Sequence, residues 1–333
     1  MSRRSSRGSR SSRPSSRVPR RFLPWLLGLN LAVAVLLGGW YAVQPGGRQL
    51  EVQRLVANAF ARDKGVTALD IAWDIWQLYY ADSATGTIAA GDKSLVYGGA
   101  PQLATGTTTT TGASRVTDTR LLTNRAYAVG YSDALGNPLW AAYRVQDLAT
   151  IPASPPRPEK FETDRRTVAR IAPEDYTNSG YDRGHLAPNY AIATRHGVAA
   201  QEETFLMSNI TPQRHALNAG LWRELEMKIA TSYPARYGEV WVLTGPVFGA
   251  NPQKLRDRVQ VPEAFYLIVI DENEGRLRTL SLLVPQETPA GADPENFLTT
   301  IDEIQRRTGL DFLRELDDTS ERAVETQRAT RLW

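Results

Sequence analysis

The feature that most constrains this chain is the segment "FLPWLLGLNLAVAVLLGGWYAV", residues 22–43, which contains no charged residue. As a helix rising 1.5 Å per residue it would span roughly 33 Å, enough to cross the hydrocarbon core of a bilayer. Trp25 lies near one end, and Trp40 and Tyr41 lie near the other, where aromatic side chains favour the membrane interfaces. We therefore expect a single-pass transmembrane anchor in the lipid bilayer.

The segment that precedes the anchor predicts its orientation. Residues 1–21 are rich in serine and hold eight arginines and no acidic residue, so we expect a disordered tail on the cytoplasmic side of an inner membrane. The rest of the chain would then be extracytoplasmic, in the periplasm. A cleavable signal peptide is the alternative, although the apolar run is long and no A-x-A-like site follows it. Either alternative places the folded body outside the cytoplasm.

Charge and cysteine content exclude several classes of protein. The net charge is +3, and because the first 21 residues contribute eight positive charges, residues 48–333 carry a formal net charge of −5. A phosphate-binding surface must therefore be a local patch on an acidic body. The chain has no cysteine, which excludes disulfides, thiolate zinc sites and a thiol nucleophile.

The first half of the chain is expected to combine a helical spacer with a β-hairpin. Residues 44–92 contain two stretches with helical periodicity, 50–65 and 68–82. The Thr/Gly-rich stretch at 104–114 is expected to be a loop, and the alternating patterns at 120–132 and 139–147 predict a hairpin. The proline-rich segment "IPASPPRPEK", 151–160, predicts an exposed connection without regular structure.

The second half is richer in strands than in helices. "ETFLMSNITPQ", 203–213, is expected to be a strand that ends in a polar turn, and "LNAGLWRELEMKIATSY", 217–233, a helix. Further strands are predicted at 239–248, 264–272 and 277–286, and a helix at about 294–308, followed by a C-terminal tail over 317–333. This pattern favours an α+β body with an antiparallel β-sheet core.

Side chains suited to proton transfer gather in one part of the sequence. All three histidines, His185, His196 and His215, fall within 31 residues. A zinc site made from the three is one interpretation, but their spacings of 11 and 19 residues match no helical ligand pair. A histidine with its ordinary pKa of about 6.5 is largely neutral at pH 7 and can accept a proton.

Three short blocks carry a specific resemblance. "DRGHLAP" (182–188), "SNITPQ" (208–213) and "LNAGLWRELE" (217–226) resemble the signature blocks of the sugar-non-specific DNA/RNA endonucleases, a ββα-metal finger family. Weaker similarity runs from about residue 94 to residue 316. The resemblance implies an endonuclease domain over 93–316 with DNA and RNA as substrates and 5′-phosphate products, and it leaves open a homodimer.

The resemblance also implies roles for individual residues. His185 corresponds to the general base that activates water, and Asn218 to the only direct protein ligand of a magnesium ion, with manganese as an alternative cofactor. An amide oxygen is a hard ligand that suits magnesium. Glu226 lies eight residues further on, about 12 Å along a helix, so we expect it to hold the metal through water.

The remaining site residues are expected to bind or position the phosphate. Arg183 can supply a bidentate contact to the scissile phosphate and to the charge that grows on it. The resemblance assigns Arg157 to a further substrate contact and Asn209, on the turn after its strand, to orienting the site. Asp182 is expected to hold the motif loop by hydrogen bonds. Because Asn218 falls near the start of its helix, free N–H groups there would also favour phosphate.

One departure from the family pattern supports a second interpretation. Some members have an arginine four residues after the glutamate, where this chain has Ala230, and Lys228 or Arg223 are candidates to compensate. The acidic body and Ala230 favour a catalytically inactive, membrane-tethered nucleic-acid-binding or scaffold protein of the same fold. The set of His185, Asn218 and Glu226 favours the enzyme.

Overall fold

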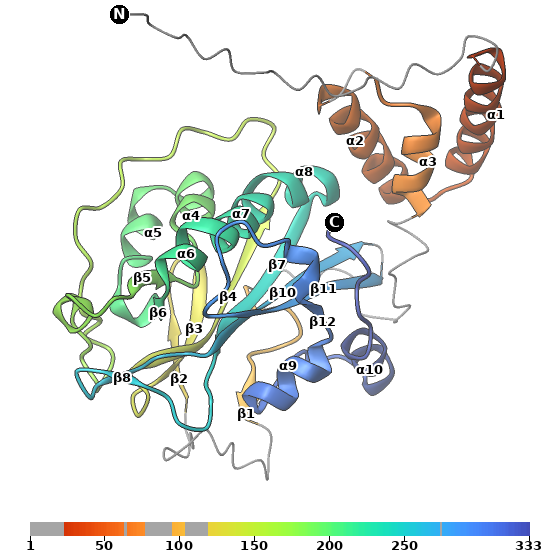
Figure 1. Cartoon of the computed structure of the whole chain (residues 1–333). Coiled ribbons are helices and arrows are strands. Elements are labelled where there is room, and N and C mark those ends of the chain that lie inside the picture. Colours follow the sequence, from red (N-terminus) through yellow and green to blue (C-terminus); the bar gives the residue numbers. More distant parts are fainter. Residues whose placement is uncertain (1–22, 63–64, 77–94, 104–118, 274) are drawn as a thin grey trace, which may run out of the picture.

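The computed structural model describes residues 23–62, 65–76, 95–103, 119–273 and 275–333. Within these residues the centre of the fold is a seven-stranded sheet in the order β12-β11-β10-β7-β4-β3-β2 (Figure 1). All neighbouring pairs are antiparallel, which confirms the α+β prediction with an antiparallel sheet core. The strands are β2 (Arg120–Thr123), β3 (Tyr127–Ser132), β4 (Asn137–Gln146), β7 (Glu239–Val247), β10 (Ala264–Asn273), β11 (Arg276–Pro285) and β12 (Leu298–Thr299).

Some expectations lie outside the described residues. These are the Ser/Arg-rich tail at 1–21, the loop at 104–114 and the last part of the helical spacer, 77–92. The connection at 151–160 is described, and it has no helix or strand, as predicted from its prolines.

The predicted strands are present because their side chains alternate between two faces. Val240 and Val242 of β7 join one apolar cluster, whereas Trp241 and Leu243 join another on the opposite face. In the predicted hairpin of β3 and β4, a Cβ on Gly130 would lie 2.1 Å from Nε1 of Trp140. Only glycine leaves room for that indole, and the strand register shifts at this point.

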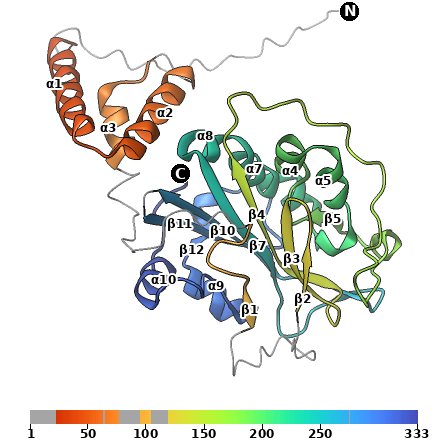
Figure 2. The ribbon, with the colours of Figure 1, turned by 180° about the vertical axis from the view of Figure 1, so that it is seen from behind.

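Helices cover both faces of the sheet. The first face carries α4 (Asn189–His196), α5 (Val198–Glu203) and the helical segment 215–237. The second face carries α9 (Ile301–Thr308), with Ile301 and Ile304 in its apolar cluster, and α10 (Asp318–Glu325), with Val324. Both views show α9 and α10 well apart from α4 and α5 (Figures 1 and 2).

Two expected elements differ from the structure. The helix expected at 294–308 begins only at Ile301, where Oγ1 of Thr300 accepts a hydrogen bond from the amide of Glu303. A 3-10 turn, Pro294–Phe297, and strand β12 take the preceding residues. The strand expected at 203–213 forms only as β6 (Ile210–Gln213), because a 3-10 turn, Met207–Asn209, comes first.

The C-terminal segment 317–333, expected as a tail, is folded. It contains α10, whose Asp317 accepts hydrogen bonds from the amides of Thr319 and Ser320. The ring of the C-terminal Trp333 lies 5.3 Å from that of Tyr237 and 5.9 Å from that of Tyr233. The end of the chain therefore packs against the helical layer of the first face.

Three N-terminal helices lie beside the body, next to α8 (Figures 1 and 2). They are α1 (Leu23–Ala42), α2 (Gly46–Arg62) and α3 (Ala68–Trp76). By length and composition, α1 is the one described helix that is apolar enough to cross a membrane, over Trp25–Ala42. The apolar helix expected at 22–43 is thus present, and two helices follow it in the expected spacer.

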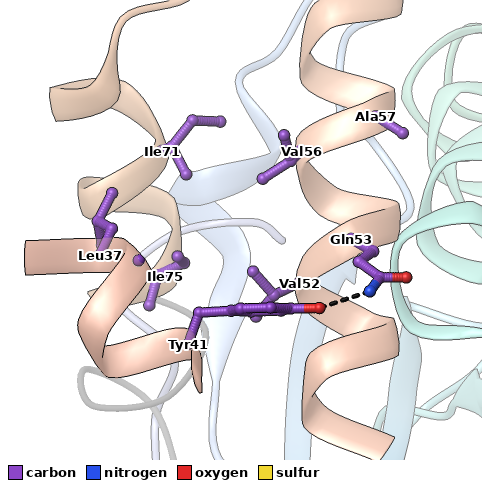
Figure 3. Close-up of a pocket in the computed structure, with 9 residues that line it drawn as sticks. Leu37, Tyr41, Val52, Gln53, Val56, Ala57, Ile71 and Ile75 are labelled. Atoms are coloured by element: carbon purple, nitrogen blue, oxygen red, sulfur yellow. Dashed lines mark hydrogen bonds between the residues drawn. The ribbon is translucent and has the colours of Figure 1, made fainter. Parts of the chain in front are cut away.

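The three N-terminal helices leave an apolar cavity of about 480 Å³ between them (Figure 3). Leu37 and Tyr41 of α1, Val52 and Val56 of α2, and Ile71 of α3 are among its lining side chains. The only polar groups drawn in it are the hydroxyl of Tyr41 and the amide of Gln53, which hydrogen-bond to each other. Around the cavity the packing of α1 is therefore mainly apolar and incomplete, and elsewhere Oδ1 of Asn30 accepts a hydrogen bond from the amide of Ala68 at 3.1 Å.

A buried ion pair joins β10 to β11. Asp271 and Arg278 face each other in the strand register, and each side chain is 1% exposed. Nε of Arg278 donates to Oδ2 of Asp271 at 2.9 Å, and the guanidinium lies 4.6 Å from the ring of Tyr237. Such a pair depends on both partners, since a lone buried charge is costly.

Arg278→Met is expected to lower the free energy of unfolding by about 3 kcal/mol or more, because it leaves the carboxylate of Asp271 buried without its partner. The double variant Asp271→Leu/Arg278→Met removes both charges and should lose clearly less. Urea unfolding of the full chain in detergent, followed by circular dichroism, measures both. A double variant as unstable as the single one would contradict this account.

Candidate active site

The three motif blocks form a hairpin followed by a helix on the first face of the sheet. Strand β5 (Asp182–His185) pairs antiparallel with β6, so that His185 faces Ile210 and Asp182 faces Gln213. The helical segment follows at once (Figure 1). It consists of α6 (His215–Leu217), the π-type turn η5 (Asn218–Trp222), α7 (Arg223–Met227), the π-type turn η6 (Lys228–Ser232) and α8 (Tyr233–Tyr237).

The helical segment begins earlier than expected and is kinked near the site. Its first residue is His215, and the amide of Asn218 donates to the carbonyl of Arg214 at 2.9 Å. The amide of Asn218 is therefore not one of the free N–H groups at the start of the segment. Gly220 has φ −101° and ψ −113°, and a Cβ there would lie 2.5 Å from Cα of Ala290. Only glycine fits at this close approach, inside the π-type turn that begins at Asn218.

His185 is buried between two aromatic rings. Its ring centroid lies 5.5 Å from that of Phe161 and 5.1 Å from that of Phe205. Burial, together with the positive charge of Arg157, lowers the pKa of His185 from 6.5 to about 3. Nε2 is buried and has no hydrogen-bond partner among the described residues. At neutral pH the imidazole is therefore uncharged and has an unsatisfied nitrogen.

The positive charge of Arg157 acts on the pKa values of both His185 and Glu226. Its exposed guanidinium stacks over the ring of Phe205, 5.0 Å from the centroid. Burial raises the pKa of Glu226 to about 8, while the charges of Arg157 and Arg223 oppose that rise. Within the described part of the chain Glu226 forms no ion pair. The structure thus brings Arg157, from the proline-rich connection, to both predicted catalytic residues.

Asp182 orients Asn218 rather than its own loop. Oδ2 of Asp182 accepts a hydrogen bond from Nδ2 of Asn218 at 2.9 Å and lies 2.8 Å from Nδ1 of His215. Because a carboxylate can only accept, the amide nitrogen of Asn218 must face it and the amide oxygen must face elsewhere. Asp182 therefore leaves the oxygen of Asn218 to act as a ligand. His215, the other neighbour of Asp182, is exposed.

Arg183 and Asn209 are tied to the protein. Nη2 of Arg183 donates to the carbonyl of Pro173 at 2.6 Å, and its guanidinium lies 5.6 Å from the centroid of Phe161. Asn209 is fully buried and precedes β6, which corrects its expected place after a strand. Its side chain accepts from the amide of Ala187 and donates to the carbonyls of Ala187 and Thr204. Asn209 thus holds the chain just beyond His185.

The position of Ala230 lies inside the core. Ala230 is 1% exposed, and its carbonyl accepts a hydrogen bond from Nη2 of Arg195 at 2.6 Å. Of the two candidates to compensate, Lys228 lies 3.7 Å from Oε1 of Glu224, whereas Arg223 acts on the pKa of Glu226. Position 230 therefore has no arginine side chain of its own, but Arg195 of α4 hydrogen-bonds to its backbone.

The aromatic rings on either side of His185 and the contact of His215 with Asp182 were not predicted from the sequence. Phe161 directly follows the proline-rich segment 151–160 and Phe205 lies in "ETFLMSNITPQ", yet nothing in the sequence around either residue indicates that they meet around a histidine. In the described residues the three histidines form no shared metal-ligand group, so the structure gives no support to the zinc interpretation.

Comparisons with known proteins agree on one family. Residues 104–319 match the family described as DNA/RNA non-specific endonuclease. A nuclease of Serratia marcescens is 31% identical over 244 residues, which cover 70% of this chain and 84% of that protein. Mitochondrial endonuclease G of Homo sapiens is 30% identical over 209 residues, 58% of this chain and 69% of that protein.

Two further matches are weaker, one in the share of the relative that is covered and the other in sequence identity. Mitochondrial nuclease EXOG of Xenopus laevis is 29% identical over 208 residues, and the chain spans only 57% of that relative's length. A crystal structure of the EndoG/EndoGI complex superimposes with a TM-score of 0.52 and 24% identity over 59% of this chain and 86% of that chain. That likeness concerns the fold.

His185→Gln is expected to change how stability depends on pH. The folded-state pKa of about 3 lies below the ordinary 6.5, so the unfolded chain binds the proton more readily at intermediate pH. As pH falls below 6.5, the wild type loses up to about 1.4 kcal/mol per pH unit from this group, and the variant does not. Thermal unfolding between pH 6.5 and 4 should show the variant gaining on the wild type; parallel curves would contradict the burial of a neutral imidazole.

Proposed function

The chain belongs to the DNA/RNA non-specific endonuclease family, and from that premise we propose that it is a metal-dependent endonuclease that hydrolyses phosphodiester bonds of DNA and RNA. One observation carries the proposal. His185 is uncharged, has an unsatisfied buried nitrogen and lies beside the exposed cation Arg157. A proton acceptor next to a phosphate-binding charge is the arrangement that phosphodiester hydrolysis requires.

His185 acts as the general base. Its Nε2 takes a proton from the attacking water, and the rings of Phe161 and Phe205 hold the imidazole in place. Asn209 supports this geometry by fixing the backbone at Ala187, two residues further on.

The residues present fit a divalent metal. Asp182 fixes the amide of Asn218 so that its oxygen, a hard ligand, is the atom left for a cation. Glu226 is a half-buried carboxylate without an ion-pair partner among the described residues, as expected of a group that faces a cation. We assign Asn218 as the direct ligand of magnesium, or of manganese, and Glu226 as a ligand through water. When bound, the metal would stabilise the negative charge that develops on the phosphate.

Phosphate binding falls to Arg157 and Arg183. Arg157 is exposed and uses the face of Phe205, which leaves its N–H groups free of protein acceptors among the described residues. Arg183 already donates one nitrogen to Pro173, so it presents only part of its guanidinium. Contacts to phosphate and metal do not distinguish bases, which supports cleavage with little sequence preference.

We place the enzyme at the inner membrane, with α1 as a single-pass anchor and the catalytic body in the periplasm. The support is the apolar length of α1 and the arginine-rich segment before it. The second candidate function is an inactive, membrane-tethered nucleic-acid-binding or scaffold protein, which the buried Ala230 favours. Metal-dependent cleavage separates the two.

The purified full chain in detergent is expected to nick supercoiled plasmid and degrade RNA with magnesium and to stop when EDTA is added. His185→Ala should reduce the cleavage rate at least about a hundredfold, as for loss of a general base. His196→Ala is the matched control, because His196 is an exposed histidine at the end of α4, and it should cut at the wild-type rate. Absence of cleavage with every divalent metal would favour the inactive alternative.

The orientation of the anchor is tested separately. A reporter that is active only outside the cytoplasm, fused after residue 60, should be active, because the eight arginines keep the N-terminus inside. The same fusion with the arginines of residues 1–21 replaced by glutamine should lose that bias. A silent wild-type fusion would refute the periplasmic placement.

A further inference from the structure

Three carboxylates gather on the second face of the sheet, away from His185. Asp311 ends β13 (Leu310–Asp311), which pairs with β1 (Gln102–Leu103), and Glu321 and Glu325 stand one turn apart on α10. One carboxylate oxygen from each lies within 4.8 Å of the others. Their neighbours Leu310 and Val324 belong to the apolar cluster of the second face. The group is therefore separate from the candidate active site.

Within the described residues the one positive charge that acts on the carboxylates is that of Arg322, on Glu321. None of Asp311, Glu321 and Glu325 forms an ion pair there, and Asp302 of α9 adds a further negative charge nearby. Burial raises the pKa of Glu325 to about 8, and the neighbouring negative charges add to the rise. Carboxylates this close repel each other unless a proton or a cation lies between them.

One oxygen of Glu325 has no polar partner, although the carboxylate also accepts a hydrogen bond from the side chain of Gln305. Its side chain is only 9% exposed, and Oε1 is buried with no hydrogen-bond partner among the residues that the structure describes. A buried oxygen of this kind normally faces a donor, a water molecule or an ion. This observation is independent of the clustering of the acids, and it favours a cation as the occupant.

The geometry suits one ion of the calcium class. Calcium takes six to eight oxygen ligands at 2.3–2.6 Å, so two ligands on opposite sides of it are up to about 5 Å apart. Oxygens within 4.8 Å of one another can therefore all contact one ion. Three carboxylates, each able to bind through two oxygens, supply up to about six ligands.

We propose that Asp311, Glu321 and Glu325 bind a divalent, oxygen-preferring cation such as calcium, which joins α10 to β13. The ion stabilises the C-terminal part of the chain and takes no part in catalysis. Glu321 and Glu325 lie beyond residue 319, where the family match ends, so the matched region contains only one of the three ligands.

Thermal unfolding of the full chain, in EDTA and in CaCl2, tests the proposal. A saturating ion should raise the wild-type Tm by about 5 °C. Glu321→Gln/Glu325→Gln should melt above the wild type in EDTA, because the repulsion is gone, and should lose the calcium-dependent rise. Asp318→Asn is the matched control, since it removes an exposed acid from the same helix and should keep the rise.

Asn218→Ala distinguishes this ion from the proposed catalytic metal, because it removes the candidate ligand there and should keep the calcium-dependent rise. Should the double variant fail to fold, isothermal titration of Glu321→Gln with CaCl2 replaces it and should show one binding event fewer than the wild type. A calcium-dependent rise that survives in the double variant, or a wild-type Tm that calcium leaves unchanged, would overturn the proposal.

Discussion

A sheet that is buried on both faces is the constraint on which the rest of this molecule depends. Strands such as β7 place alternate apolar side chains into two separate clusters, so helices must cover both sides. The candidate active site is built on one side and the carboxylate cluster on the other. The sheet thereby separates the uncharged His185 from the three clustered carboxylates, Asp311, Glu321 and Glu325.

In the candidate active site, on the first face of the sheet, hydrogen bonds within the protein determine which side-chain atoms remain available to a metal or a substrate. Asp182 takes the amide nitrogen of Asn218, and Asn209 uses its whole side chain on the backbone at Ala187 and Thr204. Nε2 of His185 is left without a partner in the described residues, as are Nε of Arg183 and Oδ1 of Asn189. Of these groups the imidazole is the one whose ordinary pKa lies near neutrality, so it is the one suited to accept a proton.

The sequence predicted what depends on local pattern. The strands β7, β10 and β11 and the hairpin of β3 and β4 follow from apolar alternation, and the three motif blocks indicated the family. The start of the helical segment at His215, the 3-10 turn before Ile210 and the stacking of Phe161 and Phe205 on His185 were not predicted. Each depends on contacts between distant segments, such as Gly220 against Ala290, which no local periodicity records.

The position of Arg157 has a consequence for the order of events. Its positive charge contributes to the weak proton affinity of His185, and the same guanidinium is the exposed charge that an anion would meet first. Pairing with a phosphate would neutralise that charge and strengthen the neighbouring imidazole as a base. The arrival of the nucleic-acid backbone would therefore make His185 a stronger base than it is in the empty site, while burial, the larger cause of its low pKa, would remain.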